Sequence, residues 1–290
     1  MGGGSWTRDS FKSYSSARGM SVDSRGAISG DYTAQEMFRQ RRIAPELDPQ
    51  NVIRECCDSE EHPNTKPVIL ALDVTGSMGG ASVKVAKELN VIMTDLYEKV
   101  KDVEFLIMGI GDLAYDNAPI QASQFESDIR IAEQLDKIYF EGGGGGNSYE
   151  SYTAAWYFGL RHCKLDCWKR GEKGIIITLG DEPLNPYLPK SALANVTGNK
   201  LQWDVETEEL YKQVVDKYEV YHLAVDDKET SYKWREREIK TTFGKYLDEN
   251  HLKVVNMDNL ASTIAGIITE TEKNVLSRIA NTDENGEISW

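Results

Sequence analysis

Short aliphatic runs alternate with longer amphipathic stretches through most of this 290-residue chain. The run at 67–72 is continuously apolar and lacks helical periodicity, which is typical of a strand buried on both faces. Similar patterns predict further strands at 103–110, 118–123, 174–179, 220–225 and 251–255. Stretches with one apolar face predict helices at 81–101, 128–138, 206–218, 236–247 and 260–280, with another ending near 168. This alternation predicts an α/β fold: a doubly wound, mostly parallel, Rossmann-like sheet of about six strands with helices on both faces.

Oxygen-bearing side chains follow several of these strands. The run at 67–72 stops at Asp73, and Thr75 and Ser77 follow at alternate positions among glycines that let the backbone bend. The strand at 103–110 is followed by Asp112, and the strand at 174–179 by Asp181. Open α/β sheets bind their ligands at the carboxyl ends of the strands. These residues therefore outline a site for a hard cation, which prefers oxygen ligands.

A run of five glycines, 142–146, precedes Asn147, Ser148 and Glu150 at the start of a predicted helix. A glycine loop before a helix is also found in nucleotide sites. The phosphate-binding loop needs a lysine after its glycines, and the dinucleotide motif needs a strand directly before them. Neither feature is present, so the choice lies between a flexible connection and a second group of oxygen ligands.

Residues 1–66 differ from the rest because glycine, serine, arginine and aspartate dominate and no apolar period emerges. The segment is predicted to be an N-terminal arm, extended or partly disordered, with short helices at 33–42 and from Asp48 onward. Either it is a disordered tail, or it becomes ordered against a partner through anchors spaced along it. The anchors would be Trp6, Phe11, Tyr14 and Met20. The globular domain is predicted at 67–281, followed by a tail at 282–290.

The chain is acidic, with 33 basic and 47 acidic side chains and a net charge of -14. This charge argues against general nucleic-acid binding and is compatible with divalent cations or basic partner surfaces. No run of about 20 apolar residues and no signal-peptide pattern is present, which predicts no membrane association and a cytoplasmic location.

Four cysteines raise the question of a zinc site. Cys56 and Cys57 are adjacent, and Cys163 and Cys167 are four apart with His162 beside them. The spacing matches none of the usual zinc patterns and favours buried or half-buried thiols.

Three motifs in order resemble the von Willebrand factor A (VWA) domain, also called the integrin I-like domain. Asp73-Val74-Thr75-Gly76-Ser77, followed by Met78, matches the first element of the metal-ion-dependent adhesion site in the version common among bacterial members. The glycine loop through Glu150 resembles the second element, and 177–183 resembles the third. The resemblance covers about 66–280.

The resemblance implies a set of metal ligands. They are Asp73, Thr75, Ser77, Asn147, Ser148 and Asp181. Many members have a threonine or aspartate in the second loop, so the choice between Asn147 and Ser148 is open, and Glu182 is an alternative to Asp181. The implied ion is Mg²⁺, with Mn²⁺ or Ca²⁺ possible, and a glutamate or aspartate of a protein partner completes its coordination.

The resulting hypothesis is a non-enzymatic, metal-dependent interaction module within a larger intracellular assembly. The resemblance implies a MoxR-type AAA+ ATPase as one possible partner. A first alternative is a structural assembly subunit whose N-terminal arm mediates oligomerisation. A second is a metal-dependent hydrolase using Asp73, which is disfavoured because Thr75 stands where a phosphatase of this kind needs a second aspartate.

Overall fold

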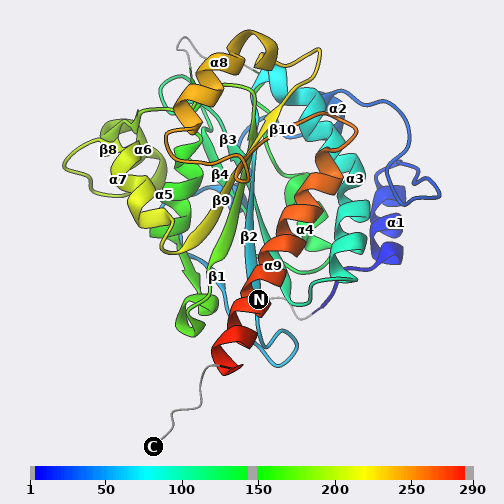
Figure 1. Cartoon of the computed structure of the whole chain (residues 1–290). Coiled ribbons are helices and arrows are strands. Elements are labelled where there is room, and N and C mark those ends of the chain that lie inside the picture. Colours follow the sequence, from blue (N-terminus) through cyan, green and yellow to red (C-terminus); the bar gives the residue numbers. More distant parts are fainter. Residues whose placement is uncertain (1–3, 143–148, 285–290) are drawn as a thin grey trace, which may run out of the picture.

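A computed structural model of the chain describes residues 4–142 and 149–284, with side chains as far as 274. A six-stranded sheet runs through the centre in the order β10-β9-β6-β2-β3-β4 (Figure 1). All neighbouring strands are parallel except β4, which is antiparallel to β3. The strands are β2 (Lys66–Asp73), β3 (Val103–Ile110), β4 (Ile120–Ala122), β6 (Gly174–Gly180), β9 (Tyr218–Val225) and β10 (Leu252–Val255). The predicted doubly wound sheet is confirmed, including Pro119 next to an edge strand.

Helices cover both faces of the sheet and bury two separate hydrophobic cores. In β2, Val68, Leu70 and Leu72 face one core, whereas Ile69 and Ala71 face the other, because successive side chains of a strand point to opposite faces. The first core lies under α1 (Arg8–Ala17), α2 (Ala34–Met37), α3 (Gly79–Tyr97), α4 (Arg130–Leu135) and α9 (Leu260–Glu284) (Figure 1). The second lies under α5 (Thr153–His162), α6 (Lys190–Thr197), α7 (Thr207–Val214) and α8 (Tyr232–Phe243).

The N-terminal segment packs on the first of these cores. Trp6, Phe11 and Met20 are buried there, and the indole Nε1 of Trp6 donates a hydrogen bond to Asn90 Oδ1 on α3 at 2.9 Å. The Tyr14 hydroxyl contacts a carboxylate that follows α4. The side chains considered as anchors for a partner thus contribute to the chain's own core.

Several local predictions need correction. The helix expected at 33–42 is only α2, which begins after a capping box formed by Thr33 and Glu36. No helix starts at Asp48; its Oδ1 accepts a hydrogen bond from the backbone N–H of Gln50 at 2.9 Å, after a short 3₁₀ turn at Pro45–Leu47. The helix expected to reach 168 ends at His162, because the next residues form a strand.

That strand belongs to one of two small sheets that the hydrophobic pattern did not predict. β5 (Cys163–Leu165) pairs in parallel with β1 (Arg54–Cys56), and β7 (Tyr187–Leu188) pairs with β8 (Val205–Glu206). The pairing buries the thiols of Cys56, Cys163 and Cys167, whereas Cys57 is half-buried. Over the stretches that the structure describes, no helix is both long enough and apolar enough to cross a membrane.

Candidate metal-binding edge

The carboxyl ends of the parallel strands, here named the carboxyl edge, hold four of the six ligands expected from sequence. Asp73 ends β2 and is fully buried. Its Oδ1 accepts hydrogen bonds from the backbone N–H of Thr75 at 2.9 Å and from Thr75 Oγ1 at 2.5 Å. These bonds tie the loop after β2 to the carboxylate at the strand end.

A second carboxylate comes from the loop after β6. Asp181 is buried, and its Oδ1 accepts a hydrogen bond from Ser77 Oγ at 3.1 Å. Its Oδ2 accepts one from the backbone N–H of Ser231, directly before α8, at 2.5 Å. The structure therefore brings Asp73, Thr75, Ser77 and Asp181 together, as the motif order predicted. Asn147 and Ser148 lie outside the described residues.

One tyrosine links these two loops. The hydroxyl of Tyr152 donates to Asp73 Oδ2 at 2.8 Å and accepts from the backbone N–H groups of Asp181 at 3.2 Å and Glu182 at 3.3 Å. A side chain at Gly180 would overlap this hydroxyl. Sequence reasoning missed Tyr152 because a buried aromatic residue at a helix start resembles an ordinary core residue.

Ser231 was also missed, although a serine before a helix is a recognisable N-cap. The predicted helix at 236–247 begins too late, since α8 starts at Tyr232. With the correct start, Ser231 would have stood out as a residue placed to donate a backbone N–H. Glu182, the residue after Asp181, forms an ion pair with Arg235 of α8 at 2.9 Å.

The carboxyl edge concentrates buried carboxyl groups, whose charged forms are disfavoured by burial. Burial raises the pKa of Asp73, and the nearby Asp181 raises it further; burial also raises the pKa of Asp181 and Glu150. Glu150 Oε2 has no hydrogen-bond partner among the described residues. Within the same residues, no lysine or arginine forms an ion pair with these three carboxylates. Buried carboxylates of this kind are costly unless a cation compensates them.

The chemistry of these donors fits a hard divalent cation. Two carboxylates and two hydroxyls offer oxygen ligands, which Mg²⁺ and Ca²⁺ prefer. Over 4–142 and 149–284, no group of three or more histidine, cysteine, aspartate and glutamate side chains is arranged to hold a metal. The hydroxyls of Thr75 and Ser77 lie beside the two carboxylates and add oxygen atoms of the kind that such a cation prefers.

Asp112 and Asp116 flank the same edge at the end of β3. The Oδ2 atom of Asp116 accepts a hydrogen bond from the backbone N–H of Asp112 at 2.7 Å, and Asp112 Oδ1 accepts one from that of Ala114 at 2.7 Å. Both carboxylates contribute to the raised pKa of Glu150. They therefore extend the acidic character of the edge.

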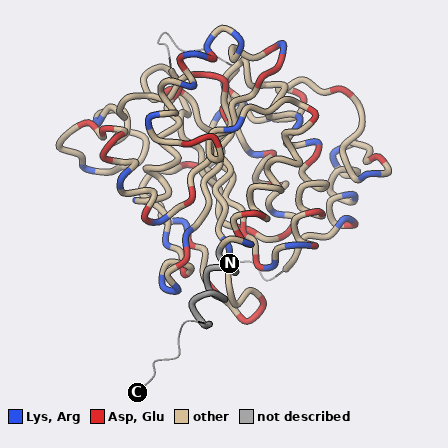
Figure 2. The backbone as a smooth tube through the Cα atoms, in the orientation of Figure 1, with Lys and Arg blue, Asp and Glu red and all other residues tan. Residues whose placement is uncertain are grey.

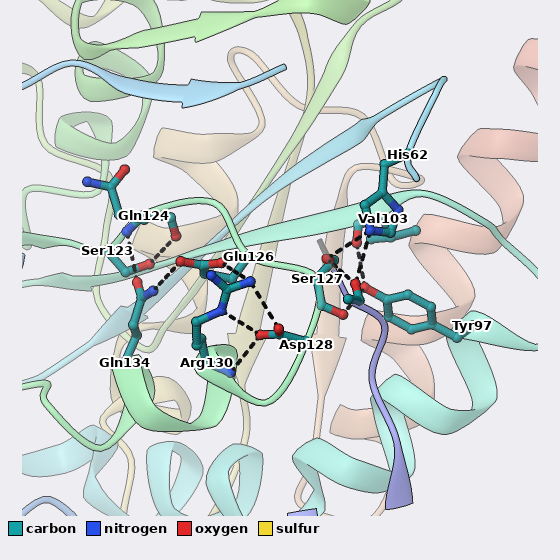
Figure 3. Close-up of polar contacts among 11 residues, drawn as sticks. His62, Tyr97, Val103, Ser123, Gln124, Glu126, Ser127, Asp128, Arg130 and Gln134 are labelled. Carbon is teal, nitrogen blue, oxygen red and sulfur yellow. Dashed lines mark hydrogen bonds and ion pairs between the residues drawn. The ribbon is translucent and has the colours of Figure 1, made fainter. Parts of the chain in front are cut away.

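At the opposite edge, at the amino ends of the parallel strands and here named the amino edge, several acids are paired with basic side chains. Figure 3 shows Arg130 between two carboxylates, with its Nε 2.8 Å from Asp128 Oδ1 and its Nη2 3.0 Å from Glu126 Oε2. In the same view, His62 lies beside Ser127, 3.2 Å from its Oγ. On its other side, the Nδ1 atom of His62 lies 3.2 Å from Asp102 Oδ1.

Comparisons with known proteins complete the description of the fold. No family model and no curated protein matches the chain. Two crystal structures of the pilus adhesin SpaC from Lactobacillus rhamnosus GG superpose on 75% of this chain at 13% identity, with TM-scores of 0.50 and 0.51. The fold is VWA-like. This VWA-like chain spans about a third of SpaC, 31% and 32% of the two structures, and at this identity the likeness extends to the fold alone.

Two bacterial structures match over nearly their whole length. The vWF domain of Mfa5, a type V pilus tip protein of Porphyromonas gingivalis, matches 72% of this VWA-like chain over 96% of its own, at 12% identity. BatB from Bacteroides thetaiotaomicron matches 72% over 99%, at 16% identity. Their TM-scores, 0.43 and 0.42, are too low for any inference about the site.

Proposed function

We propose that the carboxyl edge binds a divalent cation, Mg²⁺ first and Mn²⁺ or Ca²⁺ as alternatives, and that the loaded edge binds a carboxylate of a protein partner. One observation carries the proposal: Asp73 and Asp181 are buried side by side with hydroxyls, and no basic side chain among the described residues forms an ion pair with them. Such an arrangement is stabilised by a cation that arrives from outside the chain.

Each residue has a distinct role in this proposal. Thr75 and Ser77 offer neutral hydroxyl ligands, which Asp73 and Asp181 orient by accepting their hydrogen bonds. The second loop is proposed to add Asn147 or Ser148. A bound Mg²⁺ supplies an open coordination position and retains positive charge when several of its ligands are neutral, so it attracts an additional carboxylate.

The proposed activity is binding without turnover. A VWA-like fold favours a protein-interaction or adhesion module. The partner proposed from the sequence resemblance is a MoxR-type AAA+ ATPase, with which the chain would form a larger cytoplasmic assembly. With a net charge of -14, the chain as a whole repels an acidic partner, and a bound cation would reduce this repulsion at the carboxyl edge.

Metal binding is tested by titrating the purified chain with Mg²⁺ in a calorimeter. Asp73→Asn should lower the affinity by about 100-fold or more, because outer-shell changes alone commonly cost 10- to 100-fold. Circular dichroism should show that the variant remains folded. Asp95→Asn is the matched control, because the Asp95 side chain is 47% exposed on α3 and its one ion pair among the described residues is with Lys99. Absence of Mg²⁺ binding by the wild-type chain, at any concentration up to the millimolar range, contradicts the proposal.

The partner is tested separately. A purified MoxR-type ATPase from the same genome should bind the chain in Mg²⁺ buffer and dissociate in EDTA. Equal binding in both buffers would show that the contact does not use the carboxyl edge through a metal.

A further inference from the structure

A groove of about 610 Å³ lies beside the carboxyl edge, between α8 and the segment that follows β6. Buried Pro183, Leu184 and Asn185 contribute to its lining from the β6 side, and Thr241 and Thr242 contribute from α8. A volume of this size accommodates one or two side chains of a bound peptide.

The polar groups of the buried part of the lining already have partners within the chain. The backbone N–H of Leu184 donates to Thr242 Oγ1 at 3.1 Å. Asn185 uses both ends of its amide, since Oδ1 accepts from the backbone N–H of Thr153 at 3.1 Å and Nδ2 donates to the carbonyl of Tyr187 at 3.0 Å. With these bonds made, the interior of the groove favours an apolar side chain over a polar one.

The rim of the groove is basic, in contrast to the chain as a whole. Arg237 and Lys245 line the groove and are exposed, and neither forms an ion pair with another described residue. The acid between them in sequence, Glu238, is paired with Arg235 at 2.7 Å. Figure 2 shows acidic and basic positions interspersed along α8. Two uncompensated cations on a chain of net charge -14 therefore favour an acidic ligand at this place.

Residues that line the groove are close in sequence to residues of the carboxyl edge. Pro183 follows Asp181 by two residues on the β6 side. On the α8 side, Trp234 lies one turn before Glu238 on the same side of the helix, and its side chain is 88% exposed. An exposed tryptophan of this kind is a typical anchor of protein interfaces.

We propose that this groove binds an extended, acidic segment of a protein partner, with an apolar or aromatic side chain of the segment in the groove. Acidic residues of the segment pair with Arg237 and Lys245, and Trp234 packs against the part nearest the carboxyl edge. This inference extends the proposed function and rests on it in one respect. A further carboxylate of the same partner would bind the proposed metal.

The test selects peptides from a random library displayed on phage, using the full chain in Mg²⁺ buffer. The selected peptides should combine acidic residues with an apolar or aromatic residue. Their affinity, measured by fluorescence polarisation, should fall by about 10-fold or more when Arg237→Glu and Lys245→Glu are combined, because the partner's acids are then repelled. Thr241→Tyr, which fills the groove without changing the charge, should reduce the affinity as well.

The matched control combines Lys12→Glu with Lys200→Glu, two exposed residues on α1 and after α6, and should leave the affinity unchanged. Peptides without acidic residues, or an equal loss in the control, overturn the proposal. Self-association of the chain, detected by sedimentation and lost in the groove variants, would identify a second copy as the occupant and would also overturn it.

Repeating the measurement in EDTA separates this inference from the metal-dependent function. A loss of peptide affinity in the groove variants with and without metal supports the groove, even where Mg²⁺ itself has no effect. Mg²⁺ binding that is unchanged in the groove variants, measured by calorimetry, supports two distinct subsites. Groove variants that bind peptides as well as the wild-type chain overturn the groove and leave the metal site standing.

Discussion

The two edges of the sheet differ in whether their carboxylates form ion pairs with basic side chains of the chain. At the amino edge, Arg130 binds two carboxylates. Nearby, Arg170 pairs with Asp58 and donates to the Thr65 carbonyl at 2.9 Å. At the carboxyl edge, Asp73 and Asp181 meet hydroxyls and backbone N–H groups and form no ion pair with a basic side chain within the described ranges. Glu182, beside them, does pair with Arg235. Several acids at the amino edge are therefore neutralised by arginines of the chain itself, whereas Asp73 and Asp181 are proposed to be compensated by a cation from solution.

The largest effect should come from adding Mg²⁺ and comparing its effect on stability at two pH values. The raised pKa values of Asp73 and Asp181 mean that the folded, metal-free chain holds protons that the unfolded chain releases. The metal-free fold is then favoured at low pH and loses stability as the pH rises from about 4 through the raised pKa values. Metal binding needs the deprotonated carboxylates, so its contribution grows over the same range.

Thermal and urea unfolding measure this difference. At about 100 times the dissociation constant, Mg²⁺ should add about 2.7 kcal/mol to the free energy of unfolding at about pH 8 and much less at about pH 5. The same addition at both pH values would show that these carboxylates do not bind the ion.

A slightly smaller effect is expected from breaking the amino edge. Arg170→Ala leaves Asp58 without its ion pair and the Thr65 carbonyl without its donor, at a site where the arginine side chain is 22% exposed. The free energy of unfolding should fall by about 2 kcal/mol. Mg²⁺ affinity, measured on the folded variant, should stay the same. If Arg170→Ala changed the Mg²⁺ affinity without lowering the free energy of unfolding, the proposed difference between the two edges would be wrong.

The smallest effect is expected from Tyr152→Phe, which sharpens the comparison within the carboxyl edge. The ring remains in the core, but the hydroxyl that donates to Asp73 and accepts two backbone N–H groups is lost. Mg²⁺ affinity should fall by about 10-fold, as is typical for an outer-shell partner. Phe158→Leu, on the same helix and in the same core, is the control and should change stability without changing metal affinity.

The central strands β2 and β6 were predictable because each contains a nearly continuous aliphatic run. The strand expected at 174–179 is β6, and the one at 103–110 is β3. The end of α5 was not predictable, because it depends on β5 pairing with the distant β1. A local pattern contains no information on such a pairing.

The residues of the candidate site also differ in whether local sequence or distant contacts determine their position. Asp73, Thr75 and Ser77 share one loop and form a motif that is visible in the sequence. Tyr152 and Ser231 act only because folding brings α5 and α8 to the ends of other strands. Their side chains look ordinary in the sequence, so the structure was needed to find them.

The close approach of Tyr152 to Gly180 has a consequence for the history of this chain. A larger residue at 180 has no space while the tyrosine is present, and a smaller residue at 152 would leave a void beside Asp73. Neither position can change alone without loss, so substitutions at the two should occur together during evolution. Homologues that keep glycine and tyrosine at this pair are those in which the same hydroxyl holds both strand ends. Simultaneous replacement of both residues would identify homologues in which the carboxyl edge is held together by other contacts.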